Sequence, residues 1–421
     1  MQTAKNSLPF FSLKRFAIYA AALGFAHLIG LAAATGSTLA SNADFTAFYS
    51  AGRLFNESPD LLYDVAAQQR EVIHVEPKFP TNAYLPFVNP PFVVAIFGPL
   101  AHLPYLWAYL IWCLITSILY FGGLRLLLTA TPHITDAKSL YLLAFGFIPF
   151  HFNTLLNGQL SAIGFFFVVL AIVLDRRGKL LLSGLALVGL LYKLPLLLLI
   201  LPMLVITGRF RTLMGFIGGA MGLILVSFTF LRPHHWVDYV RITRWFAQNK
   251  TTYNDVFETA SYVDIETFFH RLIANSNIRF FVTSLTALAL AVLVIIAWRR
   301  AGKSALAWAI SITWGLVLNV YVPIHDTILL FIAGPILIES YLRAGRRVST
   351  TAVFLMALLY LCSWIALPLS IKPGWILTLA LVAFGCILNF APVESRSEPA
   401  HDTPPRVGNR ENDNHLQTAL T

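Results

Sequence analysis

The sequence predicts an all-α integral membrane protein that crosses the bilayer many times. Of its 421 residues, 57% are hydrophobic and only 12% are charged, and the mean hydropathy is +0.70. Apolar runs near or above spanning length recur along most of the chain, and they are continuous rather than alternating. Backbone groups find no water inside the hydrocarbon, so such runs must form helices. We therefore expect one polytopic helical bundle with loops on its outer face.

The apolar runs, taken in chain order, predict about 11 to 13 transmembrane helices. The first run follows Lys14 and Arg15 and is too long for a cleaved signal peptide, so it stays as the first helix. Residues 93–100 form a run too short to span, which suits a re-entrant or interfacial helix. The predicted spans are residues 16–36, 104–128, 139–155, 159–174, 180–206 as a pair of short helices, 211–231, 280–298, 304–322, 326–342, 350–369 and 373–391.

The orientation of the helices follows from the basic residues. A net charge of +10 would suit nucleic acid, but these residues lie mostly in short connections between apolar runs, which is the pattern of orientation signals. The connections at 14–15, 175–179, 207–211, 299–303 and 343–347 are therefore assigned to the cytoplasm. The chain must then cross the membrane outward and back again between residues 179 and 207. The loops 37–90 and 232–279 and the links at 157–159, 323–326 and 372–373 lie outside.

The two ends of the chain differ from the rest. Residues 1–15 are predicted to be a cytoplasmic N-terminus, and the polar segment 393–421 a disordered cytoplasmic tail that cannot bury a core.

Cys113, Cys362 and Cys386 lie in apolar segments without paired spacing, which predicts no disulfide framework. The sequence has no dense carboxylate or histidine cluster and no motif for nucleotide or zinc hydrolysis. We expect no cofactor and no obligatory metal.

Asp44 is the strongest candidate for chemistry. The chain has only 20 acidic residues, and Asp44 lies just beyond the first span, where the chain has left the lipid. Phe45, Phe48 and Tyr49 come next, at a spacing that suits a helix on the membrane surface with aromatic residues at the interface. A helix N-cap is the alternative role for Asp44. Arg53 would lie on the opposite face of that helix, so a salt bridge within the helix does not explain Asp44.

Other polar residues collect at the same predicted face. An ammonium at membrane depth requires an anion or access to water, so Lys193 is a candidate for phosphate binding, with snorkelling as the alternative. His325 could donate to a phosphate while Asp326 fixes its orientation, unless both belong to a solvated turn. The amides of Asn157 and Gln159 could hold sugar hydroxyls or cap a helix.

Two further segments are candidates for contacts with a substrate. The stretch that contains Asn89 could form a wall beside the Asp44 loop, or a simple turn into the next helix. The loop 232–279 mixes cations with aromatic residues, which suits lipid headgroups, phosphate and sugar rings, and also an ordinary interface belt.

At these residues the chain resembles the polyprenol-phosphate-mannose-dependent mannosyltransferases of glycosyltransferase family 87, which have the GT-C fold. The likeness spans roughly residues 15 to 390. It rests on Asp44-Phe45 with Phe48-Tyr49 and Gly52, on Asn89-Pro90-Pro91-Phe92, on Gly158-Gln159 and on the stretch from Gly184 to Pro195. The family commonly has Lys directly before Pro, whereas here Leu194 intervenes.

The resemblance implies that Asp44 is the general base and that Lys193 and His325 approach the donor phosphate. It also implies an outer cavity between the first loops and the bundle. Further candidates for binding the sugar or the acceptor are Tyr49, Arg53, Asn89, Asn157, Gln159 and Asp326.

We therefore expect residues 16–392 to form a transmembrane GT-C domain of the bacterial inner membrane. The expected activity moves a hexose, mannose in the first place, from a polyprenyl-phosphate donor to a glycolipid or glycan acceptor on the extracytoplasmic face, with inversion. The expected partners are this donor, this acceptor and the lipid bilayer, without nucleic acid. The alternative is a lipid-linked sugar transporter or flippase without transferase activity. The sequence assigns no oligomeric state.

Overall fold

The computed structural model describes residues 13–33, 44–77, 86–249, 262–319, 323–366 and 374–393. These residues form helices joined by turns and loops, with a single isolated bridge between Tyr262 and Pro323 in place of a sheet. The prediction of an all-α polytopic membrane protein is confirmed. Four of the described helices are long and apolar enough to cross a membrane: Tyr105–Ala130, Leu180–Leu197, Phe210–Ser227 and Ser276–Ala301.

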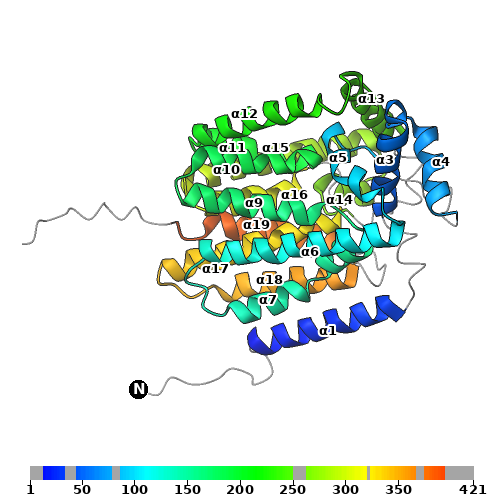
Figure 1. Cartoon of the computed structure of the whole chain (residues 1–421). Coiled ribbons are helices and arrows are strands. Elements are labelled where there is room, and N and C mark those ends of the chain that lie inside the picture. Colours follow the sequence, from blue (N-terminus) through cyan, green and yellow to red (C-terminus); the bar gives the residue numbers. More distant parts are fainter. Residues whose placement is uncertain are drawn as a thin grey trace, which may run out of the picture.

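The helices of the bundle run roughly along one axis, and their connections gather at its two ends (Figure 1). Many of their outer side chains are apolar and exposed; on α15, for example, Leu285 and Phe280 expose 58% and 75% of their surface. Faces of this kind suit contact with lipid rather than water. The bundle consists of α1 (Leu13–Ala33), α6 (Tyr105–Ala130), α7 (Ala137–Phe145), α9 (Ser161–Arg176), α10 (Leu180–Leu187), α11 (Ile200–Ile206), α12 (Phe210–Ser227), α15 (Ser276–Ala301), α16 (Leu306–Val317), α17 (Leu330–Arg343), α18 (Thr350–Ala366) and α19 (Gly374–Phe390).

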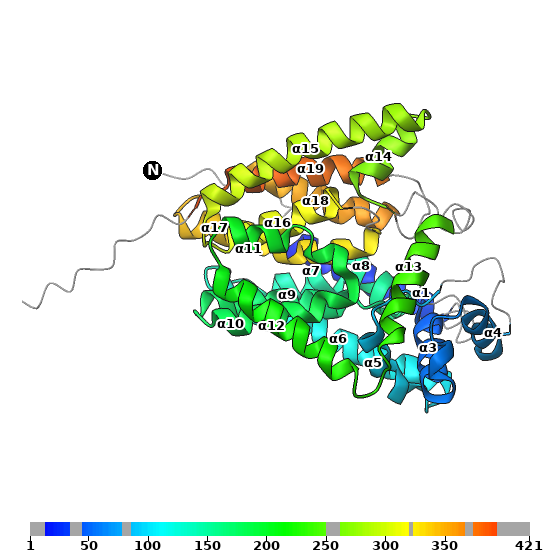
Figure 2. The same cartoon turned by 90° about the horizontal axis from the view of Figure 1, so that it is seen from above.

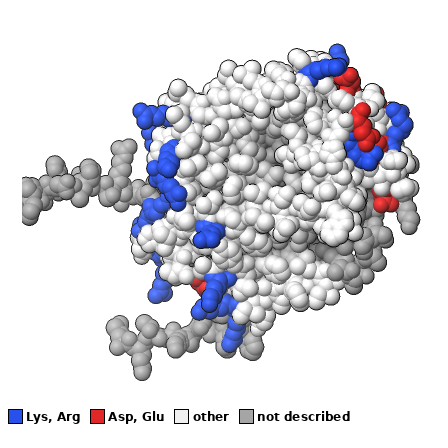
Figure 3. Space-filling model, in the orientation of Figure 1, with Lys and Arg blue, Asp and Glu red and all other residues white. Residues whose placement is uncertain are grey.

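The connections at 175–179, 207–211, 299–303 and 343–347 meet at one end of the bundle, which we call the basic end. The fully buried side chain of Arg209 ties three of its segments together, because it donates to Asp175 at 3.1 Å, to the Gly302 carbonyl at 3.0 Å and to the Ser304 carbonyl at 2.9 Å. Figure 3 shows basic residues at this end, few charges across the middle, and residues of both signs at the opposite end. An apolar middle of this kind is what a bilayer requires.

The segment 180–206 leaves the basic end and returns to it, as predicted. After α10 the chain continues as the 3₁₀ helix η5 (Val188–Leu197), which is interrupted at Lys193, where φ is −143° and ψ is 82°. Pro195 follows, and it cannot donate a backbone hydrogen bond. The chain then returns through α11 to Arg209, whose guanidinium contacts Asp175.

The predicted span 139–155 is not one helix. The structure divides it into α7, a short α8 (Ile148–Phe150) and the π-helix η4 (His151–Leu156). The break falls at Gly146, where α1 packs so closely that an added Cβ would lie 2.3 Å from the carbonyl oxygen of Ala20. Pro149, in the first turn of α8, has no backbone N–H to continue the ladder of α7.

The opposite end, which we call the loop end, carries helices that lie across the bundle (Figures 1 and 2). The prediction that the aromatic residues of the helix after Asp44 lie at the lipid interface is wrong. Phe45, Phe48 and Tyr49 are buried, because α5 and α6 cover their face. The elements of the loop end are α3 (Phe45–Glu57), η1 (Pro59–Leu61), α4 (Val65–Val75), η3 (Pro91–Val93), α5 (Val94–Leu100), α13 (His234–Asn249), α14 (Ile265–Leu272) and η7 (Ile324–Leu329).

Candidate functional site

Asp44 stands directly before α3 at the loop end. Its carboxylate makes no capping hydrogen bond to the N–H groups of that helix. Asp44 therefore does not act as the N-cap acceptor, which was the alternative role predicted from the sequence. The carboxylate instead accepts a hydrogen bond from the side-chain amide of Gln159. The neighbouring backbone is fixed as well, since the N–H of Phe45 donates to the carbonyl of Asn157 at 2.9 Å.

The turn 157–159 has little freedom to move. Gly158 has a φ of +66°, and an added Cβ would lie 2.6 Å from the Cβ of Phe45. Only glycine meets both the left-handed backbone and this close approach. The indole N–H of Trp112 donates to the Gly158 carbonyl at 2.7 Å, and the hydroxyl of Tyr109 donates to the Leu156 carbonyl at 2.8 Å. Buried aromatic residues therefore hold the turn that orients Gln159 toward Asp44.

Two opposing effects set the pKa of Asp44. Burial raises it from 3.8 to about 6, while the hydrogen bond from Gln159 and the positive charge of Lys193 keep it from rising further. The carboxylate is therefore mostly ionised at neutral pH, and its pKa lies close to the working pH. This combination suits a general base.

Lys193 and Asp326 form an ion pair, and the charge of Lys193 acts on Asp44. The ammonium of Lys193 donates to the carboxylate of Asp326, which is only 1% exposed. The second carboxylate oxygen of Asp326 accepts from the hydroxyl of Ser161 at 3.2 Å. Lys193 keeps 22% of its side chain exposed. The anionic partner that an ammonium at this depth requires is thus supplied by the chain itself.

The break in η5 that presents Lys193 is stabilised by two asparagines. The amide of Asn89 donates to the Tyr192 carbonyl at 3.2 Å, and the amide of Asn319 donates to the Pro195 carbonyl at 2.6 Å. These bonds satisfy carbonyls that the interrupted helix would otherwise leave without partners. Asn89, predicted to bind sugar or acceptor, therefore lies beside the site and supports its backbone.

Two other candidate residues make contacts that stabilise the fold. The hydroxyl of Tyr49 donates to the Leu103 carbonyl at 2.8 Å, within the buried aromatic cluster. Arg53 pairs with Glu71 and, at 3.0 Å, with Glu57. The structure does not bring either side chain to the cluster around Asp44.

The remaining candidates lie in the chain segments that border the cluster. Asn157 contributes its carbonyl to the start of α3. His325 lies in η7 directly before Asp326, and its side chain is outside the described atoms. Ser161 was not among the predicted residues, and its position two residues after Gln159 was the available signal.

An apolar groove borders the segments that carry Gln159 and Lys193. It has a volume of about 720 Å³ and lies between η3, α5, α9, α10, η5 and α12. Leu160, which follows Gln159, and Tyr192, which precedes Lys193, are part of its wall. The rest of the wall is formed by Phe92, Val93, Ile96, Ile163, Phe167, Leu185, Val188, Gly189, Gly218, Gly219, Gly222, Leu223 and Val226.

Among the described residues, Asp60, His234 and His235 lie close enough together to suggest a metal site. Arg232 already contacts both carboxylate oxygens of Asp60, at 3.2 and 3.1 Å. The ring nitrogens of His235 are also engaged, since Nδ1 accepts from the Arg232 N–H at 3.1 Å and Nε2 faces the Pro59 carbonyl at 2.9 Å. These contacts connect η1 to the start of α13, and they do not fit a resident cation.

The described residues thus define an integral membrane protein with a carboxylate, an amide and an ion-paired ammonium gathered at one end of its bundle. The sequence profile of glycosyltransferase family 87 matches residues 87–323, which is more than half of the chain, and the chain belongs to this family. It is therefore a membrane glycosyltransferase. Gln159 and Lys193 lie within the matched range, whereas Asp44 precedes it. No curated protein and no solved structure matches the chain.

Proposed function

We propose that the protein transfers a hexose from a polyprenyl-phosphate donor to a glycolipid or glycan acceptor, with Asp44 as the general base. The observation that carries this proposal is the position of the apolar groove. Leu160 and Tyr192 bring the groove to the cluster that contains Asp44 and Lys193. A lipid chain in the groove would place a phosphate beside the ammonium of Lys193 and the attached sugar near the carboxylate of Asp44.

The reaction inverts the anomeric carbon. The acceptor hydroxyl gives its proton to the Asp44 carboxylate as its oxygen forms a bond to C1 of the sugar. The bond between C1 and the phosphate oxygen breaks on the opposite face, and polyprenyl phosphate leaves with the electron pair. A base whose pKa lies near the operating pH gives efficient proton transfer.

Lys193 stabilises the charge that develops on the leaving phosphate. In the structure its ammonium is already held in place by Asp326, so little reorganisation is needed when the phosphate gains charge. His325, next in sequence to Asp326, is proposed to approach the same phosphate. Gln159 orients the carboxylate of Asp44, and with Asn157 it is proposed to contact sugar hydroxyls.

The basic end supports an extracytoplasmic position for the site. If its connections face the cytoplasm, as the positive-inside rule requires, the cluster at the loop end faces the extracytoplasmic side of the inner membrane. A polyprenyl-linked sugar is a suitable donor there, because nucleotide sugars are made in the cytoplasm. Mannose is the first sugar to test, since the resemblance to the mannosyltransferases of the family implies it.

Reconstitution tests the proposal directly. Protein in liposomes is supplied with radiolabelled polyprenyl-phosphate mannose and a lipid acceptor extract, and labelled product is measured separately from labelled donor that has crossed the bilayer. We expect product from the wild type and from Asp60→Asn, which changes an exposed carboxylate at the same end. EDTA should leave the rate unchanged. Donor that crosses without forming product would instead support the transporter alternative.

A further inference from the structure

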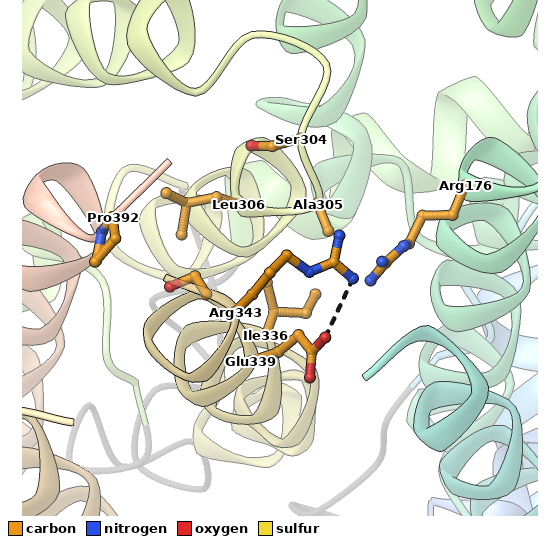
Figure 4. A pocket seen from close by; sticks show the side chains of 9 residues that line it. Arg176, Ser304, Ala305, Leu306, Ile336, Glu339, Arg343 and Pro392 are labelled. Carbon is orange, nitrogen blue, oxygen red and sulfur yellow. Dashed lines mark hydrogen bonds and ion pairs between the residues drawn. The ribbon is translucent and has the colours of Figure 1, made fainter. Parts of the chain in front are cut away.

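The groove is far larger than a second hollow, which lies at the basic end between the ends of α9, α16 and α17 (Figure 4). That hollow measures about 20 Å³, against about 720 Å³ for the groove. Its charged side chains bond within the chain: Arg343 contacts Glu339 at 3.2 Å, and Arg176 donates to the Ala130 carbonyl. The groove is therefore the hollow in which an elongated apolar ligand fits.

The groove occupies the half of α12 nearer the loop end. This helix begins at Phe210, at the basic end, and its groove-lining residues run from Gly218 to Val226, one residue before the helix ends. That stretch rises about 12 Å at about 1.5 Å per residue. The hydrocarbon core of a bilayer is about 30 Å thick, so the groove has roughly the depth of one leaflet. A lipid from that leaflet would carry its phosphate to the loop end.

Phe92, in η3, forms part of the groove wall. Three residues earlier, the amide of Asn89 donates to the carbonyl of Tyr192 at 3.2 Å, which ties η3 to the residue before Lys193. Tyr192 lines the groove as well. A lipid chain in the groove would therefore meet Phe92 in the part of the wall that adjoins the segment of Lys193.

Trp236, on α13, supports this wall from outside the groove. Its ring lies 6.2 Å from the ring of Phe92, with 41° between the two planes, a separation at which aromatic rings attract. Its indole N–H donates to the hydroxyl of Ser227 at 3.1 Å, and that hydroxyl donates to the Ile224 carbonyl at 2.6 Å. Ser227 is fully buried and follows Val226, a residue of the groove wall. One side chain thus joins Phe92 to the end of α12.

We propose that Trp236 is a positioning residue for the lipid part of the donor. It keeps the ring of Phe92 against the first isoprene units, and so fixes the place at which the phosphate leaves the groove toward Lys193. A smaller side chain at position 236 would leave a cavity into which Phe92 turns, and the lipid chain would lose that contact. This inference rests on the proposed function, because it requires a polyprenyl phosphate in the groove.

Steady-state kinetics test the role of Trp236. Trp236→Leu should raise the KM for polyprenyl-phosphate mannose several-fold and leave kcat and the KM for the acceptor unchanged, because the lipid contact is the same before and during the reaction. Trp236→Phe keeps an aromatic ring on Phe92 and should restore most of the affinity. Phe230→Leu is the matched control, since its ring lies 6.2 Å from that of Phe55, at the same end, and neither residue lines the groove.

Binding of polyprenyl phosphate without a sugar separates this inference from the proposed activity. Added to protein in phosphatidylcholine nanodiscs, it should raise the Tm of the wild type and of Phe230→Leu. It should raise the Tm of Trp236→Leu less, because weaker binding to the folded state stabilises that state less. A wild type that shows this pattern but transfers no sugar would refute the proposed function and support the role of Trp236.

Equal KM values and equal Tm shifts in Trp236→Leu and the wild type would overturn the inference. So would a wild type whose Tm does not respond to polyprenyl phosphate. If Trp236→Leu does not fold, Ser227→Ala decides, because it removes the acceptor for the indole N–H and keeps the ring. It should raise the KM for the donor and reduce the Tm shift by smaller factors, and wild-type values of both would contradict the role of Trp236.

Discussion

At the scale of single residues, the central feature is the carboxylate of Asp44. Burial removes it from water, and two neighbouring side chains partly offset the effect of burial on its pKa. Burial disfavours the ionised form of Asp44, whereas the amide of Gln159 and the charge of Lys193 favour it. A surface carboxylate with an ordinary pKa would be a weaker base. The interactions with Gln159 and Lys193 keep Asp44 ionised at neutral pH, while its pKa stays above that of an exposed aspartate.

Asp44→Asn should separate activity from stability. General-base catalysis is typically worth about 10² to 10⁴ in rate, so transfer should fall by a factor in that range. The folded-state pKa of about 6 lies above the ordinary value of 3.8, so the contribution of this group to stability is complete below 3.8 and is lost as the pH rises through 6. At pH 7.5 the variant should therefore be more stable, by an amount on the order of 1 kcal/mol.

Two measurements check this prediction. Transfer assays at equal expression give the loss of rate, with Asp60→Asn as the control. Thermal unfolding at pH 7.5 and at pH 5 gives the stability, and the advantage of the variant should be smaller at pH 5. Unchanged transfer in Asp44→Asn would remove Asp44 from the role of base.

The pH dependence of transfer gives a second prediction at this scale. Because the base must be ionised, activity should fall as the pH drops through about 6, the pKa of Asp44. Gln159→Leu removes a hydrogen bond that lowers this pKa, so the acid limb of the profile should move to higher pH. Asp60→Asn is the control, since its carboxylate contacts Arg232 and not Asp44. An acid limb that stays in place in Gln159→Leu would contradict this account of the pKa.

The sequence indicated some of these residues but not how they pair. Asp44 and Lys193 stand out because charged groups are scarce in so apolar a chain. The bond between Lys193 and Asp326 joins residues 133 positions apart, and no local pattern encodes it. Whether Asp44 would serve as a helix cap was equally open, because the carboxylate can reach either the helix N–H groups or a distant amide, and packing decides between them.

At the scale of elements, the turn before α9 is the part that fixes the site most tightly. Gly158→Ala should destabilise the protein and lower transfer, because it adds both a strained φ and a clash with Phe45. A left-handed conformation alone costs about 1 to 2 kcal/mol for a residue with a Cβ. Gly178→Ala is the matched control, because Gly178 has a φ of +72° and nothing within 4 Å of its added Cβ. Equal loss of stability in both variants would show that the contact with Phe45 contributes nothing.

The apolar groove gives the next prediction at this scale. Gly222 lines the groove, and a Cβ added to it meets no atom within 4 Å, so Gly222→Leu should fill the groove without disturbing α12. The KM for a polyprenyl-phosphate donor should rise several-fold. Gly122→Leu on α6 is the control, because it has the same free space and lies outside the groove. If both variants kept the wild-type KM, the groove would not hold the lipid chain.

Helix positions could be predicted more reliably than helix breaks. Long apolar runs determine α6, α12 and α15 on their own, because a bilayer allows few other structures. The break at Gly146 depends on the approach of Ala20 from α1, and the buried face of α3 depends on α5 and α6. Those contacts are tertiary, so the pattern of apolar residues alone predicted one straight span and an interfacial helix.

At the scale of the whole molecule, the separation of the basic end from the loop end allows a test of orientation. In a background without native cysteines, Lys179→Cys lies at the basic end and Arg241→Cys lies on α13 at the loop end, and both positions are exposed. A maleimide that cannot cross the membrane should label Arg241→Cys in intact cells. Lys179→Cys should react only after permeabilisation. Labelling of both from outside would refute the arrangement of the bundle in the bilayer.

The flanks of the groove have a kinetic consequence. Ile96, Leu185 and Val226 line it and are exposed by 43%, 51% and 56%, so the groove faces sideways toward the surrounding acyl chains. A lipid substrate would reach the enzyme by lateral diffusion, without passing through water. Turnover would then follow the mole fraction of donor in the leaflet rather than its concentration per volume of buffer. Adding inert phospholipid at a fixed amount of donor would slow the enzyme.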